Sequence, residues 1–117
     1  MKKDFPKVII DSLEMTENNY ERGKGEKWNC TTLIEHSKKF KVFDMPLAGI
    51  STYGTPWGVI DSLDGFLYHI KRIENTSLEH PIILDDYGNI CDGWHRVCKA
   101  ILKGDTTIKA IRLENMP

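Results

Sequence analysis

The sequence has little that would direct it to a membrane, a disulfide framework or a polyanion. It has three cysteines, an odd number without Cys-x-x-Cys spacing, which argues against a disulfide framework or a zinc knuckle. No apolar run approaches the ~20 residues that span a bilayer, and the N-terminus lacks the apolar stretch of a secretory signal. Lysine and arginine number 16 against 17 aspartate and glutamate. We therefore expect a cytoplasmic protein with reduced thiols, no membrane partner and no bulk attraction to nucleic acid.

The length and composition favour one domain. A chain of 117 residues with 40% hydrophobic and 28% charged residues suits a single compact core over residues 1–117. Internal repeats and low-complexity tracts are absent. Because short strands and helices are expected in alternation, the predicted fold class is a small mixed α/β (α+β) domain with helices packed on one sheet.

In the first third of the chain, a β-branched run predicts a strand over residues 7–13 that enters the core. Residues 14–28 are polar and rich in Asn, Glu and Gly, which is typical of a loop. A helix is expected next, capped by Thr31 or Thr32 and carrying apolar positions as far as Phe40.

The middle of the chain predicts a strand over residues 43–50, which Pro46 restricts to a strand end, an edge or a bulge. Residues 51–58 are rich in Gly and Pro and predict a loop. Asp61 or Ser62 is expected to cap the clearest helix, because the apolar residues after it recur at helical spacing.

The last third predicts a hairpin of residues 81–84 and 89–91, because turn residues separate two short apolar runs. A helix is expected to begin after Gly93 and to stop at Gly104, with one apolar stripe formed by Trp94, Val97, Cys98 and Ile101. Residues 108–113 predict the final strand.

The segment Asp92-Gly93-Trp94-His95-Arg96 concentrates the candidate chemistry. A helix that begins at a glycine turn presents free N–H groups and the positive end of its dipole, beside an imidazole and a guanidinium. Such a helix end can hold phosphate oxygens. Asp92 can cap the helix, contact a metal-coordinated ligand or orient His95. The alternative is structural, because Asp-Gly is a common junction and a His-Arg pair often faces solvent.

Residues 81–113 resemble the core of the ParB/sulfiredoxin-like superfamily. The segments that carry the resemblance are Pro81-Ile82-Ile83-Leu84, Gly88-Asn89-Ile90, Asp92-Gly93-Trp94-His95-Arg96, Lys99-Ala100, Gly104 and the closing strand. Residues 7–25 match more weakly and residues 31–80 carry no shared motif, so the latter are expected to hold the specificity determinants. The family includes nucleotide-dependent partition clamps, sulfinic-acid reductases, free-serine kinases and domains named as nucleases, so the resemblance alone does not choose a reaction.

The resemblance implies that Gly93, His95 and Arg96 bind nucleotide phosphates. Trp94 stands where sulfiredoxins carry their reactive cysteine, so sulfinic-acid reduction is not expected. Cys91 and Cys98 are expected to be core thiols. Partition clamps carry a helix-turn-helix module after this domain, so a detached nucleotide-binding domain is expected here and a complete partition protein is not.

The first functional hypothesis is a nucleotide-binding domain that takes ATP, ADP or CTP with Mg²⁺ and carries out phosphoryl transfer or nucleotide hydrolysis. The expected catalytic residues are His95, as a proton carrier or charge stabiliser, Asp92, which orients His95 or the metal shell, and Glu21. Arg22 beside Glu21 and Lys99 on the helix are further expected phosphate ligands, and the early loop is expected to close over the site.

Two other hypotheses differ in class. A ParB-like nuclease or DNA-binding accessory would use the Lys99 and Lys103 strip beside Arg96, and the net charge weighs against it. A non-catalytic interaction or immunity-type module would keep the turn for structural reasons. Trp57 is expected to pack in the core or at its rim, with stacking on a substrate ring as the alternative.

The remaining polar candidates predict no protein metal site. The histidines at positions 36, 69 and 80 (His36, His69 and His80) have no metal-ligand spacing, and His69 is expected to be exposed or half-buried. Asp85 and Asp86 lie at the hairpin turn, where aspartate suits local hydrogen bonding to the backbone. Magnesium would arrive with the nucleotide and be held mainly by its phosphates.

Overall fold

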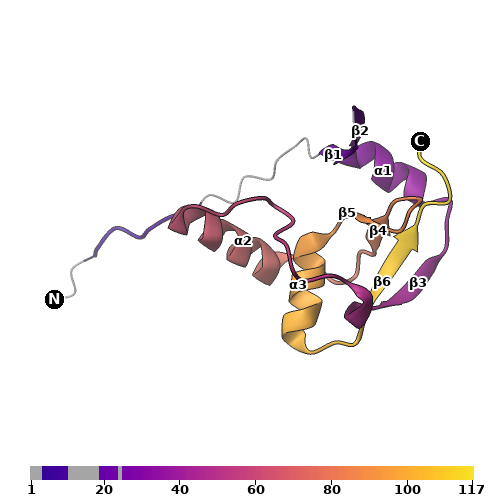
Figure 1. Cartoon of the computed structure of the whole chain (residues 1–117). Helices are drawn as coiled ribbons and strands as arrows, with labels where there is room; N and C mark the ends of the chain where they lie inside the picture. Colours follow the sequence, from indigo (N-terminus) through magenta and orange to yellow (C-terminus); the bar gives the residue numbers. More distant parts are fainter. Residues whose placement is uncertain (1–3, 11–18, 24) are drawn as a thin grey trace.

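A computed structural model describes residues 4–10, 19–23 and 25–117 (Figure 1). These residues form three α-helices, a short 3-10 helix and six strands arranged in two sheets. The fold is therefore small and mixed α+β, which confirms the predicted fold class. Within the described ranges, no helix is both long and apolar enough to cross a membrane.

The larger sheet has four strands in the order β3 (Val42–Pro46), β6 (Thr107–Arg112), β4 (Ile82–Leu84) and β5 (Ile90–Asp92). β4 and β6 are parallel, whereas β3 with β6 and β4 with β5 are antiparallel. A parallel pair requires a crossover, and β5 with the helix after it supplies the connection from β4 to β6. Pro46 ends the edge strand β3, which confirms its predicted position.

The central strand β4 explains why the sheet has two cores. Ile82 and Leu84 face one core with Val97 and Ala100 of α3 (Trp94–Lys103), whereas Ile83 faces the other. All three β4 residues are buried, so the strand reads as a continuous apolar run rather than an alternating one. The sheet is thus covered on both faces.

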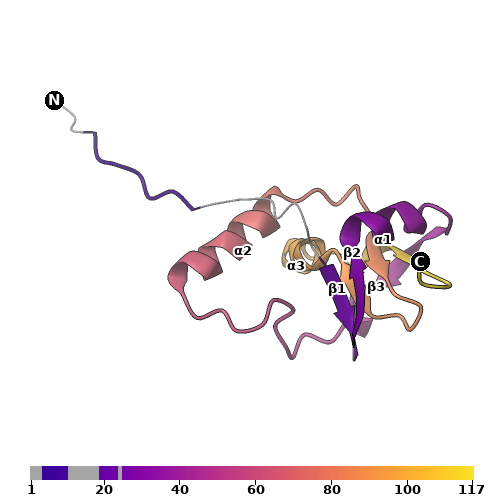
Figure 2. The ribbon, with the colours of Figure 1, turned by 90° about the horizontal axis from the view of Figure 1, so that it is seen from above.

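The second core lies under α1 (Cys30–Ser37), whose Leu33 is fully buried. Its cap is the Asn29 side chain, which accepts a hydrogen bond from the Thr31 amide at 2.8 Å. The predicted caps, Thr31 and Thr32, are therefore wrong, because both residues lie inside the first turn of the helix. Phe40 lies beyond the end of α1 but packs against the same core. Seen from above, α1 and α3 lie on opposite sides of the sheet (Figure 2).

α2 (Leu63–Asn75) is the helix that the apolar spacing predicts, and Ser62 caps it by accepting a hydrogen bond from the Gly65 amide at 3.0 Å. It packs on α3 rather than on the sheet (Figure 2). Because a single helix covers it, none of its residues is buried and Phe66 stays half exposed. The 3-10 helix at Leu47–Gly49 and the loop over residues 51–58 precede α2.

Residues 19–29 correct the predicted loop, because they contain a β-hairpin of β1 (Asn19–Arg22) and β2 (Glu26–Asn29). Tyr20 and Trp28 are cross-strand partners whose rings stack with centroids 6.0 Å apart. Both pack on the α1 core, and this tertiary burial stabilises a pair of four-residue strands that has no apolar period of its own. Residues 14–18 of the predicted loop lie outside the described residues.

The predicted first strand is wrong in its described part. Residues 7–10 have no regular secondary structure, and Val8 and Ile9 are 85% and 86% exposed. A β-branched run favours extended backbone, but a strand also needs a partner, and the described residues offer it none. The segment is anchored at the Ile10 carbonyl, which accepts a hydrogen bond from Lys71 at 3.1 Å. Residues 11–13 lie outside the described ranges.

The C-terminal predictions are confirmed in order and type: the β4–β5 hairpin, α3 and β6 all form. Gly104 ends α3 in the left-handed conformation (φ 87°). Ile101, expected on the buried stripe of α3, is instead 41% exposed, and Ala100 takes the buried position.

Candidate functional site

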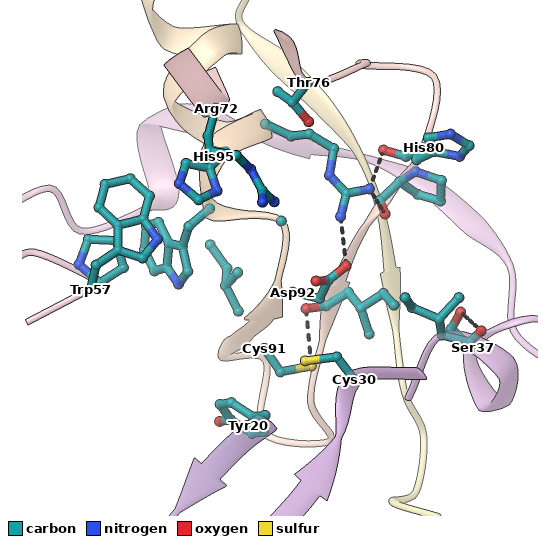
Figure 3. A pocket seen from close by; sticks show the side chains of 18 of the residues that line it. Tyr20, Cys30, Ser37, Trp57, Arg72, Thr76, His80, Cys91, Asp92 and His95 are labelled. Atoms are coloured by element: carbon teal, nitrogen blue, oxygen red, sulfur yellow. Dashed lines mark hydrogen bonds and ion pairs between the residues drawn. The ribbon is translucent and has the colours of Figure 1, made fainter. Parts of the chain in front are cut away.

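A cavity of about 1080 Å³ opens where β5 ends and α3 begins (Figure 3). Its wall includes all five residues of the segment Asp92–Arg96. Residues 19–21 of β1, the Trp57 loop and the inner face of α2 complete it. The volume is sufficient for a nucleotide-sized ligand. The part of the chain that the sequence singled out therefore lines this cavity.

Gly93 makes the turn into α3 possible in two ways. Its φ of 111° lies in the left-handed region, which side chains rarely adopt. A Cβ there would also lie 2.6 Å from Cγ2 of Ile82, so the turn packs directly on the central strand. Only glycine satisfies both conditions without a shift of β4.

The amino end of α3 carries no side-chain cap. The N-cap residue is Gly93, and no acidic residue lies in the first turn. Asp92 therefore does not cap the helix, which corrects one of the roles predicted for it. The first backbone hydrogen bond of the helix runs from the Val97 amide to the Gly93 carbonyl, so the helical amides before Val97 are available to an external acceptor. Such an end attracts an anion.

Arg72 is the cation that faces this end of the cavity. It extends from α2 into the cavity beside His95 (Figure 3). Its guanidinium makes no ion pair or hydrogen bond with any of the described side chains. It also lowers the pKa values of both His69 and His95 by its charge. A half-buried guanidinium without a counter-ion is suited to receive an anionic ligand.

Trp57, His69 and His95 form a packed aromatic cluster on the same wall. The Trp57 ring stacks on His69 with centroids 4.2 Å apart and on His95 with centroids 4.5 Å apart. Nδ1 of His69 lies 2.9 Å from Nε2 of His95. Trp57 was expected in the core or at its rim, but it is not among the residues packed on either apolar core, and its ring partners are the two imidazoles.

The histidine cluster is uncharged at neutral pH. Burial lowers the pKa of His95 to about 4, helped by the positive charges of Arg72 and Arg96. The pKa of His69 is also lowered, by burial first and by Arg72 second. A neutral imidazole can accept a proton, so His95 has the protonation state that a base requires.

Arg96 is held by the protein itself. Its Nη1 donates to the carbonyl oxygens of His80 and Pro81 at 3.0 and 2.9 Å, and its Nη2 donates to Asp92 at 2.7 Å. The predicted phosphate ligand thus fixes the approach to β4, and the Asp92 carboxylate is its counter-ion. Asp92 and Arg96 shape the cavity mainly as a pair.

Lys99 and Arg22, also predicted as phosphate ligands, do not line this cavity. Lys99 donates to the carbonyls of Glu74 and Thr76 at 3.0 and 2.7 Å and so binds the C-terminal end of α2. The basic strip expected on α3 therefore joins helices. Glu21 does line the cavity, with its side chain 70% exposed and 3.7 Å from Lys27.

Arg22 belongs to a closed cluster around Asp85, at the far end of the β4–β5 hairpin. The buried Asp85 carboxylate accepts hydrogen bonds from the Tyr20 hydroxyl at 2.7 Å and from the Tyr87 and Asn89 amides, each at 2.9 Å. Arg22 pairs with Asp85, Asp86 and Glu26. These contacts join the β1–β2 hairpin to the main sheet.

The hydrogen bonds within the Asp85 cluster shift the pKa values of Asp85 and Tyr20. Burial would raise the pKa of Asp85, but the bonds from Tyr20, Asn89, Tyr87 and Arg22 hold it below its ordinary value. Burial and the bond to Asp85 raise the pKa of Tyr20. The cluster therefore keeps Asp85 ionised and Tyr20 neutral.

The cysteines are protonated thiols; Cys91 is a buried core thiol as expected, whereas Cys98, also expected in the core, is only half-buried. Burial raises the pKa of Cys91 to about 12 and that of Cys30 to about 11, and it also raises the pKa of Cys98. Cys91 donates to the Ile83 carbonyl at 3.3 Å. A protonated thiol is a poor nucleophile, so we assign these cysteines no nucleophilic role.

The donor set of the cavity fits a metal that arrives with its ligand. In the described part of the chain, no group of three or more His, Cys, Asp or Glu side chains is arranged to hold a metal ion. Glu21 is the more exposed cavity carboxylate, 3.7 Å from Lys27, and Asp92 is bonded to Arg96 at 2.7 Å. Mg²⁺ bound chiefly by phosphates and water needs no more than one such carboxylate.

Sequence analysis missed Arg72 and the partnership of His69 with His95. Residues 69 and 72 are three apart on one helix and so share a face. That spacing, beside an apolar stripe, was the available signal. It could not show that the face meets the His95 turn, because α2 and α3 are separated by two strands in the sequence.

Comparison with protein-family models, with curated proteins and with solved structures finds no match to this chain. Its functional assignment therefore rests on the geometry of the cavity and on the motif described above.

Proposed function

We propose that this protein is a nucleotide-binding domain that holds the phosphates of a nucleoside di- or triphosphate at the amino end of α3. ATP, ADP and CTP, each with Mg²⁺, are the candidate ligands. The proposed fold family is the ParB/sulfiredoxin-like superfamily, on the motif over residues 81–113. The proposed chemistry is phosphoryl transfer or nucleotide hydrolysis.

One observation carries the proposal: an uncapped helix end and an unpaired guanidinium face the same cavity. The α3 amides have no side-chain acceptor, and Arg72 has no counter-ion among the described residues. Each group alone is tolerable in a folded protein, but together they concentrate positive potential in one partly desolvated place. A phosphate group supplies the acceptor oxygens and the charge that both lack.

The other side chains follow from this placement. Arg72 is the proposed phosphate clamp, together with the α3 amides, and Gly93 lets the phosphate approach the backbone. Asp92 and Arg96 keep the turn rigid as an ion pair. His95 is the proposed proton acceptor, and Glu21 is the proposed carboxylate for the water shell of Mg²⁺. When bound, Mg²⁺ neutralises phosphate charge.

A DNA-acting function has less support from the structure. Of the expected basic strip on α3, Lys99 and Arg96 are hydrogen-bonded to protein carbonyls, and Lys103 lies 3.6 Å from the Asp105 carboxylate, so the three do not form a free phosphate-binding surface. A backbone-tracking site needs several free cations. Among the described residues that line the cavity, Arg72 is the cation without a counter-ion, and together with one helix end it suits a small ligand.

The test is isothermal titration calorimetry of the purified protein with ATP, ADP, CTP and inorganic pyrophosphate, each with and without Mg²⁺. Arg72→Met keeps most of the aliphatic stem and removes the charge. We expect it to weaken binding by about 1.5–3 kcal/mol, or roughly 10- to 150-fold, because it removes a charged hydrogen-bond donor. Lys103→Met is the matched control, since Lys103 is 63% exposed and does not line the cavity.

Binding that is equally strong in Arg72→Met would overturn the phosphate site. Absence of binding to all four compounds would favour the non-catalytic module. Unfolding of each variant in urea is measured alongside, so that loss of binding is separated from loss of the fold.

A further inference from the structure

His69 and His95 meet through one nitrogen of each ring, a contact that phosphate binding does not require. Nδ1 of His69 and Nε2 of His95 are 2.9 Å apart. The ring centroids are 5.2 Å apart and the planes differ by 19°, which fits two imidazoles that meet edge to edge in nearly one plane. Two neutral rings in this arrangement share a single proton between the facing nitrogens, so one nitrogen donates and the other accepts.

We infer that His69 is a positioning residue that holds His95 as its Nε2–H tautomer and leaves Nδ1 of His95 as the proton acceptor of the cavity. The inference deepens the proposed function and rests on it for the identity of the proton donor.

The direction of the hydrogen bond follows from tautomer preference. If His95 donates through Nε2, then both rings are in the Nε2–H form, which is the more stable tautomer of a free neutral histidine. If His69 donates instead, then both rings must adopt the less stable Nδ1–H form. Nδ1 of His69 has Nε2 of His95 as its partner, and Nδ1 of His95 has no hydrogen-bond partner among the described residues that would offset this cost. The first arrangement is therefore favoured.

The surroundings of the pair hold it in place. Trp57 stacks on both rings, and Tyr68 meets His69 edge-on with centroids 5.1 Å apart. The charged groups that face His95 are Arg72 from α2 and Arg96 from α3, and the latter is paired with Asp92 at the end of β5. The Trp57 loop contributes no charge to the contact. A stacked, half-buried pair has little freedom to rotate, so the tautomer of one ring sets that of the other.

His95 takes up one proton in the proposed phosphoryl transfer. An acceptor hydroxyl, from water or an alcohol, gives its proton to Nδ1 of His95 while its oxygen bonds to the terminal phosphorus. The bond from that phosphorus to the bridging oxygen breaks, and the electron pair leaves with the departing phosphate. His95 is then an imidazolium whose Nε2–H bond to Nδ1 of His69 becomes charge-assisted. His95 afterwards releases the proton to solvent or to the leaving group.

A bound phosphate is expected to assist this step. Arg72 disfavours a positive charge on His95, and an anion paired with Arg72 offsets that effect. Ligand binding and proton uptake by His95 are therefore coupled, with the same sign in both directions.

The first test reads the tautomer directly, by ¹⁵N NMR of the protein labelled at its histidines and without ligand. We expect His95 in the wild type to be the Nε2–H tautomer alone. His69→Phe keeps a ring under Trp57 but removes the acceptor, and a mixture of both tautomers is expected for His95. His69→Asn, whose Oδ1 can take the place of Nδ1, restores the single tautomer. His80→Gln is the matched control, because the exposed His80 side chain has no contact with His95.

An Nδ1–H tautomer of His95 in the wild type, or an unchanged tautomer in His69→Phe, would overturn the inference. If His69→Phe does not fold, the wild-type spectrum and the His69→Asn spectrum decide the question. The second test measures the pKa of His95 by a pH titration followed by ¹⁵N NMR, with and without about 50 mM inorganic pyrophosphate as an excess of ligand over protein. A rise in the His95 pKa is expected, and a fall would contradict the coupling. If pyrophosphate fails to bind, the proposed function fails while the tautomer result stands.

Discussion

The two ends of the β4–β5 hairpin carry similar residues and have opposite character. At the turn end, Asp85 accepts bonds from side chains and backbone, and Arg22 is shared among three carboxylates. At the other end, the amides of α3 have no side-chain acceptor and Arg72 has no described counter-ion. One end is closed within the protein, and the other is open to a ligand.

The difference shows that charged residues indicate function only through their partners. Arg22 was a predicted phosphate ligand, and it proves to be part of a structural cluster. Arg72 carried no motif, and it is the cation that the cavity leaves unpaired. A guanidinium that is satisfied internally stabilises the fold, whereas an unsatisfied one is available for binding.

The largest expected effect is at the closed end. Asp85→Ala leaves Tyr20 and two backbone amides without their buried acceptor, so we expect a loss of about 3–5 kcal/mol in the free energy of unfolding. Urea denaturation followed by circular dichroism measures it. The control is Asp86→Ala, because the Asp86 side chain is 26% exposed and a smaller loss is expected. Equal losses in the two variants would remove the distinction.

At the open end, Gly93→Ala tests whether the turn is built on close approach to β4. The new Cβ adds left-handed strain and a 2.6 Å contact with Ile82, for an expected loss of about 2–4 kcal/mol. Gly104→Ala is the control, since its φ is also left-handed but nothing lies within 4 Å of a Cβ there. It should lose only about 1–2 kcal/mol. A thermal or urea unfolding series that ranks the two variants the other way would contradict the packing argument.

Arg96→Ala separates a structural arginine from a ligand-binding one. Because Arg96 bonds to Asp92 and to two carbonyls, we expect a loss of about 1.5–3 kcal/mol in unfolding free energy. Lys103→Ala, whose ion pair is exposed, should change stability by less than about 0.5 kcal/mol. Unchanged stability of Arg96→Ala in urea would show that its bonds contribute nothing to the fold.

The smallest effect is a pH dependence of stability at the open end. The pKa of His95 is about 4 in the folded protein against 6.5 for an unperturbed histidine. Between these values the unfolded chain binds more protons, so the stability due to neutral His95 is complete above pH 6.5 and is lost as the pH falls towards 4. Allowing for solvent screening, the loss is about 1–2 kcal/mol.

Unfolding in urea at several pH values across this window, for the wild type and His95→Phe, isolates that contribution. The variant should show the shallower dependence. Identical slopes would mean that His95 is not held neutral. The closed end behaves differently, because the depressed pKa of Asp85 makes its stabilisation persist above pH 4 and fade only as the pH falls through its folded value.

Much of the fold was predictable because its signals are local. Helical apolar spacing marks α2, and two short apolar runs around turn residues mark the β4–β5 hairpin. A glycine at each end delimits α3. These patterns depend on residues a few positions apart, which a sequence presents directly.

The first 30 residues were not predictable in the same way. The hairpin of residues 19–29 forms through the Tyr20–Trp28 pair and its packing on a distant core, and the β-branched run at residues 8–10 stays exposed. Both outcomes depend on what the segment meets in three dimensions, and propensity carries no information about that.

The sequence by itself determined where the chemistry concentrates: a strand, a glycine turn and a helix that begins with His95 and Arg96. Only the tertiary structure decided which groups are free. It paired Arg96 with Asp92 and carbonyls, moved Arg22 to Asp85 across 63 residues, and brought His69 and Arg72 to the turn. The physical reason is range: local backbone preferences fix elements, whereas satisfaction of a charge or a hydrogen bond depends on which elements come together.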